Sequence, residues 1–259
     1  MTETTAKFAR YPSLEGRVVL ITGGATGIGE SMVRHFARQG SRVAFLDIQD
    51  EAAQDLARSL AAEGSAAPSY VHCDLTDVAA LQAAVERIAK AYGAIDVLVN
   101  NAANDQRKKT DDVTPEFWDQ SMAVNLRSQF FAAQAVIPVM KAAGRGSILN
   151  FSSIAWMVPS VGMPVYVAAK AATVGLTKTL AKELGPDNIR VNCILPGGIA
   201  TERQQRLWYT PEYVANMIAC QSLKRTLVPD DVARLALFLA ADDSSAITGQ
   251  SHIVDGGWM

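Results

Sequence analysis

The sequence has few cysteines, few histidines and no large excess of charge of either sign. Its 259 residues include three of each, and the formal net charge is −2 at pH 7. Cys73, Cys193 and Cys220 stand far apart with no CxxC pair. This argues against a disulfide framework or a zinc knuckle and favours a reducing, cytoplasmic location. The histidines are equally scattered, so we expect no metal site.

Long apolar runs and basic stretches are missing as well. No run of about 18 apolar residues predicts a membrane span, and the first residues, MTETTAKFARYPSLEG, lack the apolar centre of a signal peptide. The densest basic run, Arg107-Lys108-Lys109, is followed at once by two aspartates. That pattern is typical of a solvated loop, not of a nucleic-acid-binding stripe. We therefore expect neither a nucleic acid nor a membrane as a partner.

What the sequence does contain is a regular alternation of short β-branched segments and longer helical segments. Strands are expected at 17–23, 42–48, 70–75, 95–103, 146–153, 189–197 and 251–257. Helices are expected at 27–39, 50–62, 77–91, 115–142 and 166–184. Such alternation predicts an α/β fold, with parallel strands joined by right-handed crossovers and helices on both faces. We expect one domain over residues 1–259 with about seven strands.

One long stretch, about 198–210, follows a strand and shows no regular pattern. Long loops inside compact domains are often functional. The sequence therefore predicts a substrate lid near residues 198–222.

A glycine-rich loop, TGGATGIG at 22–29, stands between the first strand and the first helix. A Rossmann sheet binds the phosphates of a dinucleotide at this place, on free N–H groups of the helix N-terminus. The spacing Gly23-x-x-x-Gly27-x-Gly29 differs from the commoner GxGxxG, and alone it could be a tight turn. The strand before it and the helix after it favour a nucleotide site that includes Thr26 and Ile28. We therefore expect a doubly wound parallel sheet of the Rossmann type.

Two acidic residues end the next two strands. Asp47 follows Gly29 by 18 residues, where a carboxylate accepts hydrogen bonds from the ribose hydroxyls. It would repel a 2′-phosphate and no arginine stands next to it, so we expect NAD and not NADP; taken alone, it could be a surface turn residue. Asp74, with Leu75 after it, can bond the adenine edge or, together with Thr76, cap the next helix.

The segment YVAAK, 166–170, places Tyr166 and Lys170 one helical turn apart on one face. Ser153 ends a strand 13 residues before Tyr166, where side chains point into the ligand crevice of a parallel sheet. A nearby ammonium lowers the pKa of a tyrosine, which could make Tyr166 a base. Each residue alone could be structural, but their joint occurrence favours chemistry.

These motifs together resemble the classical short-chain dehydrogenase/reductase family. The resemblance runs from about Leu14 to Met259 and rests on TGGATGIG, NNA (100–102), VNL (124–126), Ser153, YVAAK and PGGIAT (196–201). It implies a catalytic tetrad of Asn125, Ser153, Tyr166 and Lys170, with Asn100 positioning the central strand. It further implies cofactor contacts from Asn101, Ala102, Tyr166, Lys170, Pro196, Gly197, Ile199 and Thr201. One departure is Ala103, where the family usually has the glycine of NNAG.

The chemistry that the resemblance implies is alcohol oxidation. Tyr166 as phenolate takes the alcohol proton while a hydride passes to the nicotinamide C4 of NAD. Lys170 favours the phenolate, and Ser153 hydrogen-bonds the reacting oxygen. Asn125 is expected to hold a water that relays the proton from Lys170 to solvent. No metal is needed.

Longer stretches look like bacterial aldose 1-dehydrogenases of the D-xylose type. They are YPSLEG (11–16), NDQRKKTDDVTPEFWD (104–119), NFSSIAW (150–156), TERQQRLWYTPE (201–212) and DGGW (255–258). The resemblance implies oxidation of the anomeric hydroxyl of an aldose to a lactone. The aldose would be a pentose or hexose such as D-xylose, L-arabinose, D-galactose, L-fucose or L-rhamnose.

The candidate sugar ligands are polar or aromatic. Side-chain amides and carboxylates can grip vicinal hydroxyls, and a tryptophan can stack on a pyranose. The residues are Asn104, Asp105, Ser153, Trp156, Tyr166, Arg203 and Trp208, and Gln204 lies beside Arg203 in the expected lid. Some of them can equally be structural: Trp208 at a subunit contact, and Arg203 paired with Glu202 or solvent.

Two other functions compete with this one. The first is an NADPH-dependent ketone or 3-oxoacyl reductase, which Asp47 and the polar lid disfavour. The second is a catalytically inactive NAD-binding regulator, which the presence of all four tetrad residues disfavours. The resemblance also implies a homotetramer, built through the helices within 115–142 and 166–184 and the C-terminal strand.

Overall fold

The computed structural model describes residues 8–158 and 160–259 and contains a seven-stranded parallel sheet. The order is β3-β2-β1-β4-β5-β6-β7. The strands are β1 (Val18–Thr22), β2 (Arg42–Asp47), β3 (Ser69–His72), β4 (Val97–Asn100), β5 (Gly146–Phe151), β6 (Ile189–Pro196) and β7 (Ser251–Val254). Residues 1–7, in which much of the N-terminal prediction falls, lie outside the described part.

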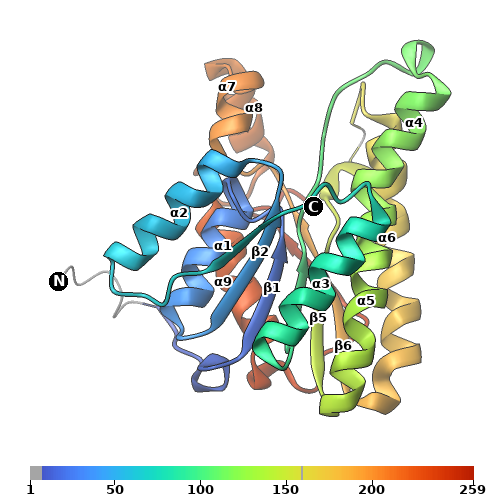
Figure 1. The fold of residues 1–259 in the computed structure, drawn as a ribbon. Coiled ribbons are helices and arrows are strands. Elements are labelled where there is room, and N and C mark those ends of the chain that lie inside the picture. The colour runs from blue at the N-terminus through green and yellow to red at the C-terminus, as the bar shows by residue number, and fades with distance from the viewer. Residues whose placement is uncertain (1–7, 159) are drawn as a thin grey trace.

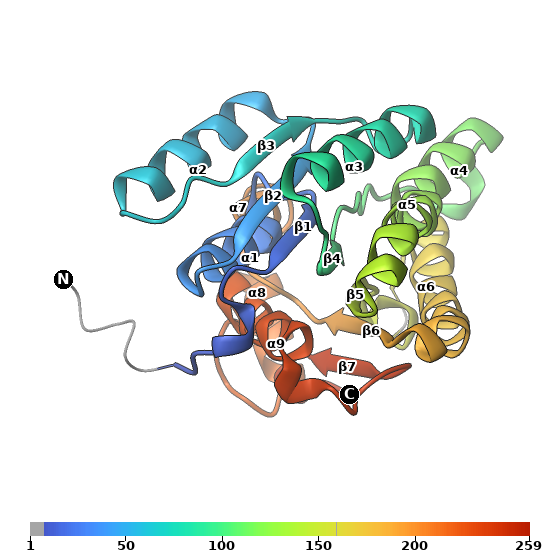
Figure 2. The ribbon, with the colours of Figure 1, turned by 60° about the horizontal axis from the view of Figure 1, so that its bottom comes forward.

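Helices cover both faces of this sheet, as Figures 1 and 2 show. One face carries α1 (Gly27–Arg38), α2 (Asp50–Ala62) and α9 (Pro229–Ala240). The other carries α3 (Val78–Tyr92), α5 (Ser128–Ala143) and α6 (Pro164–Leu184). The prediction of a doubly wound α/β sheet of the Rossmann type is confirmed.

The core lies on both sides of the sheet because successive strand residues point to opposite faces. In β1, Val19 and Ile21 join the cluster under α1 and α9, and Val18 and Leu20 join the cluster under α3 and α5. All four are fully buried. This burial explains why the strands read as continuous apolar runs.

The sheet positions the site through its strand order. From β1 the chain adds β2 and β3 on one side and then β4 to β7 on the other. Connections therefore leave the carboxyl ends of β1 and β4 in opposite directions, which opens a ligand crevice between them. The short helices α4 (Pro115–Met122), α7 (Glu202–Leu207) and α8 (Pro211–Cys220) rise above this edge in Figure 1.

Several predicted elements differ from the structure. The strands expected at 70–75 and 95–103 are shorter, because the chain leaves the sheet after His72 and Asn100. The helix expected at 115–142 is interrupted by a π-helical turn, η4 (Ala123–Arg127). The stretch 198–210 is not irregular, since α7 lies within it and Thr201 caps that helix. Neither α8 nor α9 was expected, although Pro229 followed by two aspartates is a helix-start signal.

Within residues 8–158 and 160–259, no helix has the length and apolar character that a bilayer crossing requires. In the same part of the chain, no cluster of three or more His, Cys, Asp or Glu side chains could hold a metal ion.

Candidate active site

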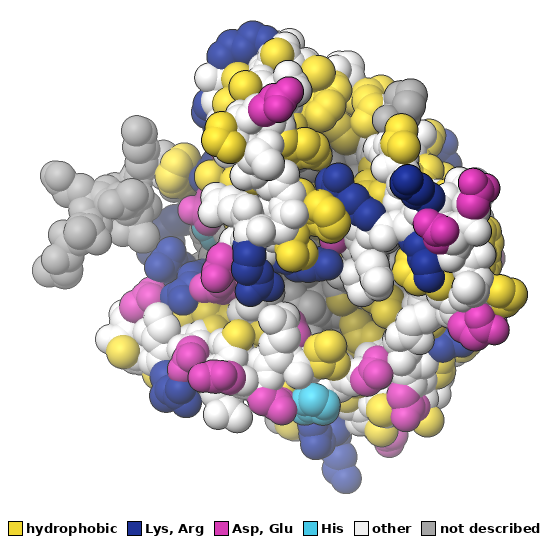
Figure 3. Space-filling view, turned by 90° about the horizontal axis from the view of Figure 1, so that it is seen from above, with side chains coloured by type: hydrophobic (Ala, Val, Ile, Leu, Met, Phe, Trp, Pro, Cys, Tyr) yellow, Lys and Arg dark blue, Asp and Glu magenta, His cyan; other side chains and the backbone are white. Residues whose placement is uncertain are grey.

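A cavity of about 890 Å³ opens at the carboxyl edge of the sheet. Figure 3 looks onto this edge and shows the hollow, with lysine and arginine side chains at its rim. Most of the predicted site residues line it: Gly23, Thr26, Gly27, Ile28, Gly29, Asp47, Asp74, Leu75, Asn101, Ala102, Asn104, Asp105, Ser153, Tyr166, Lys170, Pro196, Gly197, Ile199, Thr201 and Arg203. Three do not appear on its wall: Asn125, Trp156 and Trp208.

The glycine loop is built for close approach at one end of the cavity. Gly23 and Gly27 have φ of 67° and 61°, in the left-handed region that favours glycine. A Cβ on Gly29 would lie 1.8 Å from the carbonyl oxygen of Gly23. The amide of Asn101 donates to that same oxygen at 2.9 Å and so ties the loop to β4. The glycines therefore leave the backbone at the start of α1 uncovered by side chains, which suits the binding of a pyrophosphate.

Asp47 is buried beside this loop with its carboxylate held by backbone donors. One oxygen accepts from Ala25 N at 2.9 Å, and the other from Ile48 N at 2.8 Å and Gln49 N at 3.0 Å. Its side chain cannot swing away, so a negative charge stands at the end of β2. This fits an acceptor for ribose hydroxyls and opposes a phosphate at the same place.

Asp74 closes a turn instead of capping a helix. Its carboxylate accepts from Thr76 N at 2.9 Å and from Thr76 Oγ1 at 2.8 Å. The residue that caps α3 is Asp77, which accepts from Ala80 N at 3.0 Å. The alternative that Asp74 is the helix cap is therefore wrong, while its contact with adenine stays a prediction.

The loop after β6 closes the cavity opposite the glycines. Thr201 caps α7 by accepting from Gln204 N at 3.2 Å, and its Cγ2 would be 3.2 Å from a Cβ on Gly27. Thr201 thus lies close to the glycine loop, and both border the cavity. Ala103 also lines the cavity and is exposed, so its extra methyl group meets open space.

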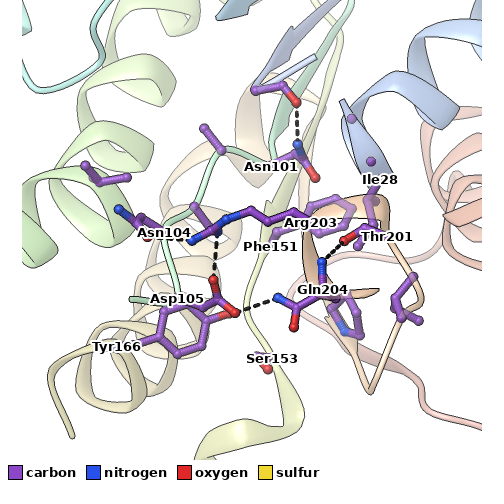
Figure 4. A pocket seen from close by; sticks show the side chains of 18 of the residues that line it. Ile28, Asn101, Asn104, Asp105, Phe151, Ser153, Tyr166, Thr201, Arg203 and Gln204 are labelled. Atoms are coloured by element: carbon purple, nitrogen blue, oxygen red, sulfur yellow. Dashed lines mark hydrogen bonds and ion pairs between the residues drawn. The ribbon is translucent and has the colours of Figure 1, made fainter. Parts of the chain in front are cut away.

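Ser153, Tyr166 and Lys170 come together in the middle of the cavity. Tyr166 and Lys170 lie one turn apart on α6, with Lys170 Nζ 5.5 Å from the Tyr166 ring centre. Nζ donates to the carbonyl of Phe151 at 2.8 Å. Ser153 follows β5 directly, and its Oγ accepts from Ala155 N at 3.1 Å. Figure 4 shows the Tyr166 ring and Ser153 beside the substrate end of the cavity.

Burial is the largest cause of the pKa shifts of Tyr166 and Lys170. It raises the pKa of Tyr166 well above 10, and the Asp105 carboxylate shifts it in the same direction; Ser153 and Arg203 oppose the rise. Burial also lowers the pKa of Lys170 from 10.5 to about 8. The phenol is therefore held protonated near neutral pH, opposite to the shift expected from Lys170 alone. An oxidised nicotinamide supplies the hydride acceptor and a positive charge when bound, and that charge favours the phenolate.

Asn125 supports the site from behind. It is fully buried in the π-helical turn η4. Its Oδ1 accepts from Asn104 N at 2.9 Å, and its Nδ2 donates to Asn104 O at 3.0 Å and to Ser121 O at 2.9 Å. The side chain therefore clamps the backbone of the loop after β4. A proton relay through a water on Asn125 stays a prediction.

The substrate end joins the loop after β4 to α7. Asp105 accepts from Arg203 Nη1 at 2.8 Å and from Gln204 Nε2 at 2.6 Å, as Figure 4 shows. The alternative partner for Arg203, Glu202, is thus wrong. Gln204, which the sequence placed beside Arg203 in the polar lid, lines the cavity as well. Both α7 and α8 lie in the segment where the lid was expected, and the role of this segment as a substrate lid stays a prediction.

The two predicted tryptophans lie differently from what we expected. Trp156 in η5 (Ile154–Trp156) is 37% exposed and does not line the cavity, and its stacking on a sugar ring stays a prediction. Trp208 packs behind the wall: the guanidinium carbon of Arg107, which lines the cavity, lies 4.1 Å from its ring centre. Sequence reasoning placed Arg107 in the loop but did not predict this stacking.

Comparisons with known proteins show similarity over nearly the whole chain. The family model described as Enoyl-(Acyl carrier protein) reductase matches residues 23–259. A probable galactose dehydrogenase of Rhizobium meliloti is 51% identical over 253 residues, which cover 98% of this chain and 99% of that protein. The D-xylose 1-dehydrogenase of Caulobacter vibrioides is 49% identical over 251 residues, covering 96% and 98%. The chain belongs to the short-chain dehydrogenase/reductase family.

A solved structure of the family has nearly the same fold. It is described as a candidate NAD(P)-dependent gluconate 5-dehydrogenase from Beutenbergia cavernae with bound NADP. It superposes with a TM-score of 0.90 at 32% identity and covers 95% of this chain and 98% of its own. The present short-chain dehydrogenase is thus an oxidoreductase that acts on a CH–OH group and binds a nicotinamide cofactor.

Proposed function

We propose that this short-chain dehydrogenase is an NAD-dependent aldose 1-dehydrogenase that converts the cyclic form of an aldose into the aldonolactone. The observation that carries the proposal is the polar substrate end, where Asp105, Arg203 and Gln204 meet beside Tyr166. A hydrophobic substrate offers this polar cluster no hydrogen-bonding group, whereas a sugar brings hydroxyls that can both donate to it and accept from it. Two relatives whose sequences are 51% and 49% identical to this chain are named as a probable galactose dehydrogenase and a D-xylose 1-dehydrogenase.

The reaction follows from the three groups at the centre. Ser153 donates its hydroxyl hydrogen to the reacting oxygen and fixes its position. Tyr166 as phenolate would take the proton of the anomeric hydroxyl, and a bound oxidised nicotinamide would accept the hydride from C1, so that C1–O becomes a carbonyl. Lys170, on the same helix face, supplies positive charge below the phenolate.

The preference for NAD rests on Asp47. Its carboxylate is immobilised by three backbone donors at the end of β2. A 2′-phosphate beside it would place like charges together, at a cost of about 1–4 kcal/mol at contact distance near a protein surface.

The test is the absorbance of reduced nicotinamide with purified enzyme, NAD or NADP, and a panel of aldoses and simple secondary alcohols. We expect turnover of one or two aldoses with NAD, and a loss of about 10²- to 10⁴-fold in Tyr166→Phe with NAD binding unchanged. Activity on secondary alcohols alone would refute the sugar assignment. Faster reduction of ketones or 3-oxoacyl thioesters with NADPH would establish the reductase alternative instead.

A further inference from the structure

The substrate end of the cavity is crossed by one polar bridge between distant parts of the chain. Asp105 comes from the loop after β4, and its two carboxylate oxygens bond to Arg203 and Gln204 of α7, 98 and 99 residues away. Arg203 also donates to the side-chain oxygen of Asn104 at 3.3 Å. We call Asp105, Arg203 and Gln204 the polar bridge.

The polar bridge stands next to the reacting groups. In Figure 4 the Asp105 carboxylate lies between the Tyr166 ring and Gln204, with Ser153 close by. The charges of Asp105 and Arg203 are both near enough to act on the Tyr166 phenol. A substrate whose hydroxyl reaches Tyr166 and Ser153 must therefore bring its neighbouring atoms against the polar bridge.

Asp105 is held more firmly than its partners. The preceding residue, Asn104, is clamped by Asn125 through both its N–H and its carbonyl. Further along the loop, Lys108 N donates to Gly162 O at 2.7 Å. The side chain of Asp105 is 17% exposed, whereas that of Arg203 is 43% exposed. Arg203 can therefore exchange a partner for a ligand or water more easily than Asp105 can.

The chemistry of the polar bridge selects for hydroxyl groups. A carboxylate only accepts hydrogen bonds, and a guanidinium only donates them, while a hydroxyl does both. A hydroxyl on the carbon next to the reacting one can thus donate to Asp105 and accept from Arg203. A methylene at that position can neither donate nor accept a hydrogen bond, so it cannot replace any contact between Asp105 and Arg203 that the substrate disturbs.

We propose that Asp105 is a specificity-determining residue that selects substrates with a hydroxyl next to the oxidised carbon, which enters the polar bridge and donates to its carboxylate. This inference rests on the proposed function and names the feature of the substrate that the site reads. It makes the substrate class a vicinal diol, of which an aldose oxidised at C1 is one case.

The experiment compares matched substrate pairs. The first pair is the aldose that the enzyme oxidises and its 2-deoxy analogue. Sites that hydrogen-bond a substrate hydroxyl can reject the analogue by about 10⁴-fold, and for this half-open site we expect a preference of about 10²-fold in kcat/KM. In Asp105→Ala the preference should fall to within about fivefold, mostly through loss on the parent sugar. Asp105→Asn keeps the shape of the side chain without its charge, and its preference should lie between those of the wild type and Asp105→Ala.

The matched control is Asp112→Ala, which removes an exposed carboxylate from the short helix η3 (Thr110–Asp112) further along the same loop. It should keep the wild-type preference. Thermal unfolding and NAD binding show whether the variants are folded. If Asp105→Ala and Asp105→Asn reduce kcat/KM equally on both substrates, or leave the preference intact, the inference is overturned.

A second pair, 1,2-cyclohexanediol and cyclohexanol, separates this inference from the proposed function. A preference for the diol that disappears in Asp105→Ala supports the inference even if no aldose is oxidised, which would refute only the aldose assignment. Wild-type enzyme that oxidises cyclohexanol as efficiently as the diol overturns the inference, whatever its activity on sugars.

Discussion

At the scale of single residues, the site depends on charges held in buried places. Asp47 is 7% exposed and Lys170 is 1% exposed. Buried charges destabilise a fold unless hydrogen bonds compensate them. Backbone donors hold Asp47, and the carbonyl of Phe151 holds Lys170. Such charges act strongly on a ligand because little water screens them.

Neutralising Asp47 should relax the choice of cofactor. In Asp47→Asn the ratio of kcat/KM for NADP to that for NAD should rise by about 10- to 100-fold, since the like-charge repulsion is lost. Initial rates with each cofactor at saturating substrate measure this ratio. Asp55→Asn, an exposed position on α2, is the control and should not change it. An unchanged ratio in Asp47→Asn would show that Asp47 does not face the ribose.

The buried Lys170 side chain should lower the free energy of unfolding, by an amount that depends on pH. Its pKa is lowered by burial to about 8, so below pH 8 the folded protein carries the full cost of a buried ammonium. The cost disappears as the pH rises from 8 to 10.5, where the unfolded lysine also loses its proton.

Lys170→Met should therefore raise the free energy of unfolding by about 1–3 kcal/mol at pH 7 and by less at pH 10, while abolishing activity. Denaturant titrations at both pH values measure the gain. Lys178→Met, at an exposed position of the same helix, is the control. A gain that is the same at both pH values would contradict a titrating Lys170.

At the scale of elements, a π-helical turn that interrupts a helix holds the loop after β4 in place. The π-helical turn η4 carries Asn125 between α4 and α5. Single π-turns inside helices often occur at functional sites. Here the turn directs the amide of Asn125 to the backbone of Asn104, next to Asp105. The side chain of Asn125 thus fixes the backbone of the loop after β4.

Asn125→Ala should loosen that loop. We expect faster amide hydrogen exchange in peptides covering 101–109, because Asn104 N loses its acceptor. A fall of about 10²-fold in kcat/KM should accompany it, since small misplacements of positioning groups are costly. Asn216→Ala, exposed on α8, should leave exchange in these peptides unchanged. Unaltered exchange in Asn125→Ala would show that the clamp is dispensable.

At the scale of the whole molecule, the described surface leaves apolar side chains uncovered on the α4–α5–α6 face. Trp118 and Phe130 are 44% and 40% exposed. Phe130 lines an apolar groove of about 340 Å³ together with Met122, Leu126, Phe131 and Leu176, among others. Exposed apolar patches of this kind mark interaction sites. We propose that a second copy of the chain covers this face in a homotetramer.

Phe130→Glu should dissociate such an assembly, because it places a carboxylate in an apolar contact. Sedimentation velocity at micromolar concentration should show a tetramer for the wild type and smaller species for the variant. The control is Gln54→Glu, which adds the same charge at an exposed position of α2. A monomeric wild type, or a variant that stays tetrameric, would contradict the proposal.

The sequence by itself determined the α/β architecture, the glycine loop, Asp47 and the Ser153–Tyr166–Lys170 group. These features depend on local patterns: the alternation of strands and helices, and residues within one turn or at a strand end. Helices that are short or follow a loop, such as α7 and α8, were missed because their apolar pattern is too brief to read.

Only the tertiary structure decided which of the polar and aromatic candidates meet. Asp105 pairs with Arg203 and Gln204 because the loops after β4 and β6 converge over the crevice. Trp156 turns to the surface, although only two residues separate it from Ser153 in the sequence. Contacts between segments about a hundred residues apart depend on how the twisted sheet brings its strand ends together, and no local pattern encodes that geometry.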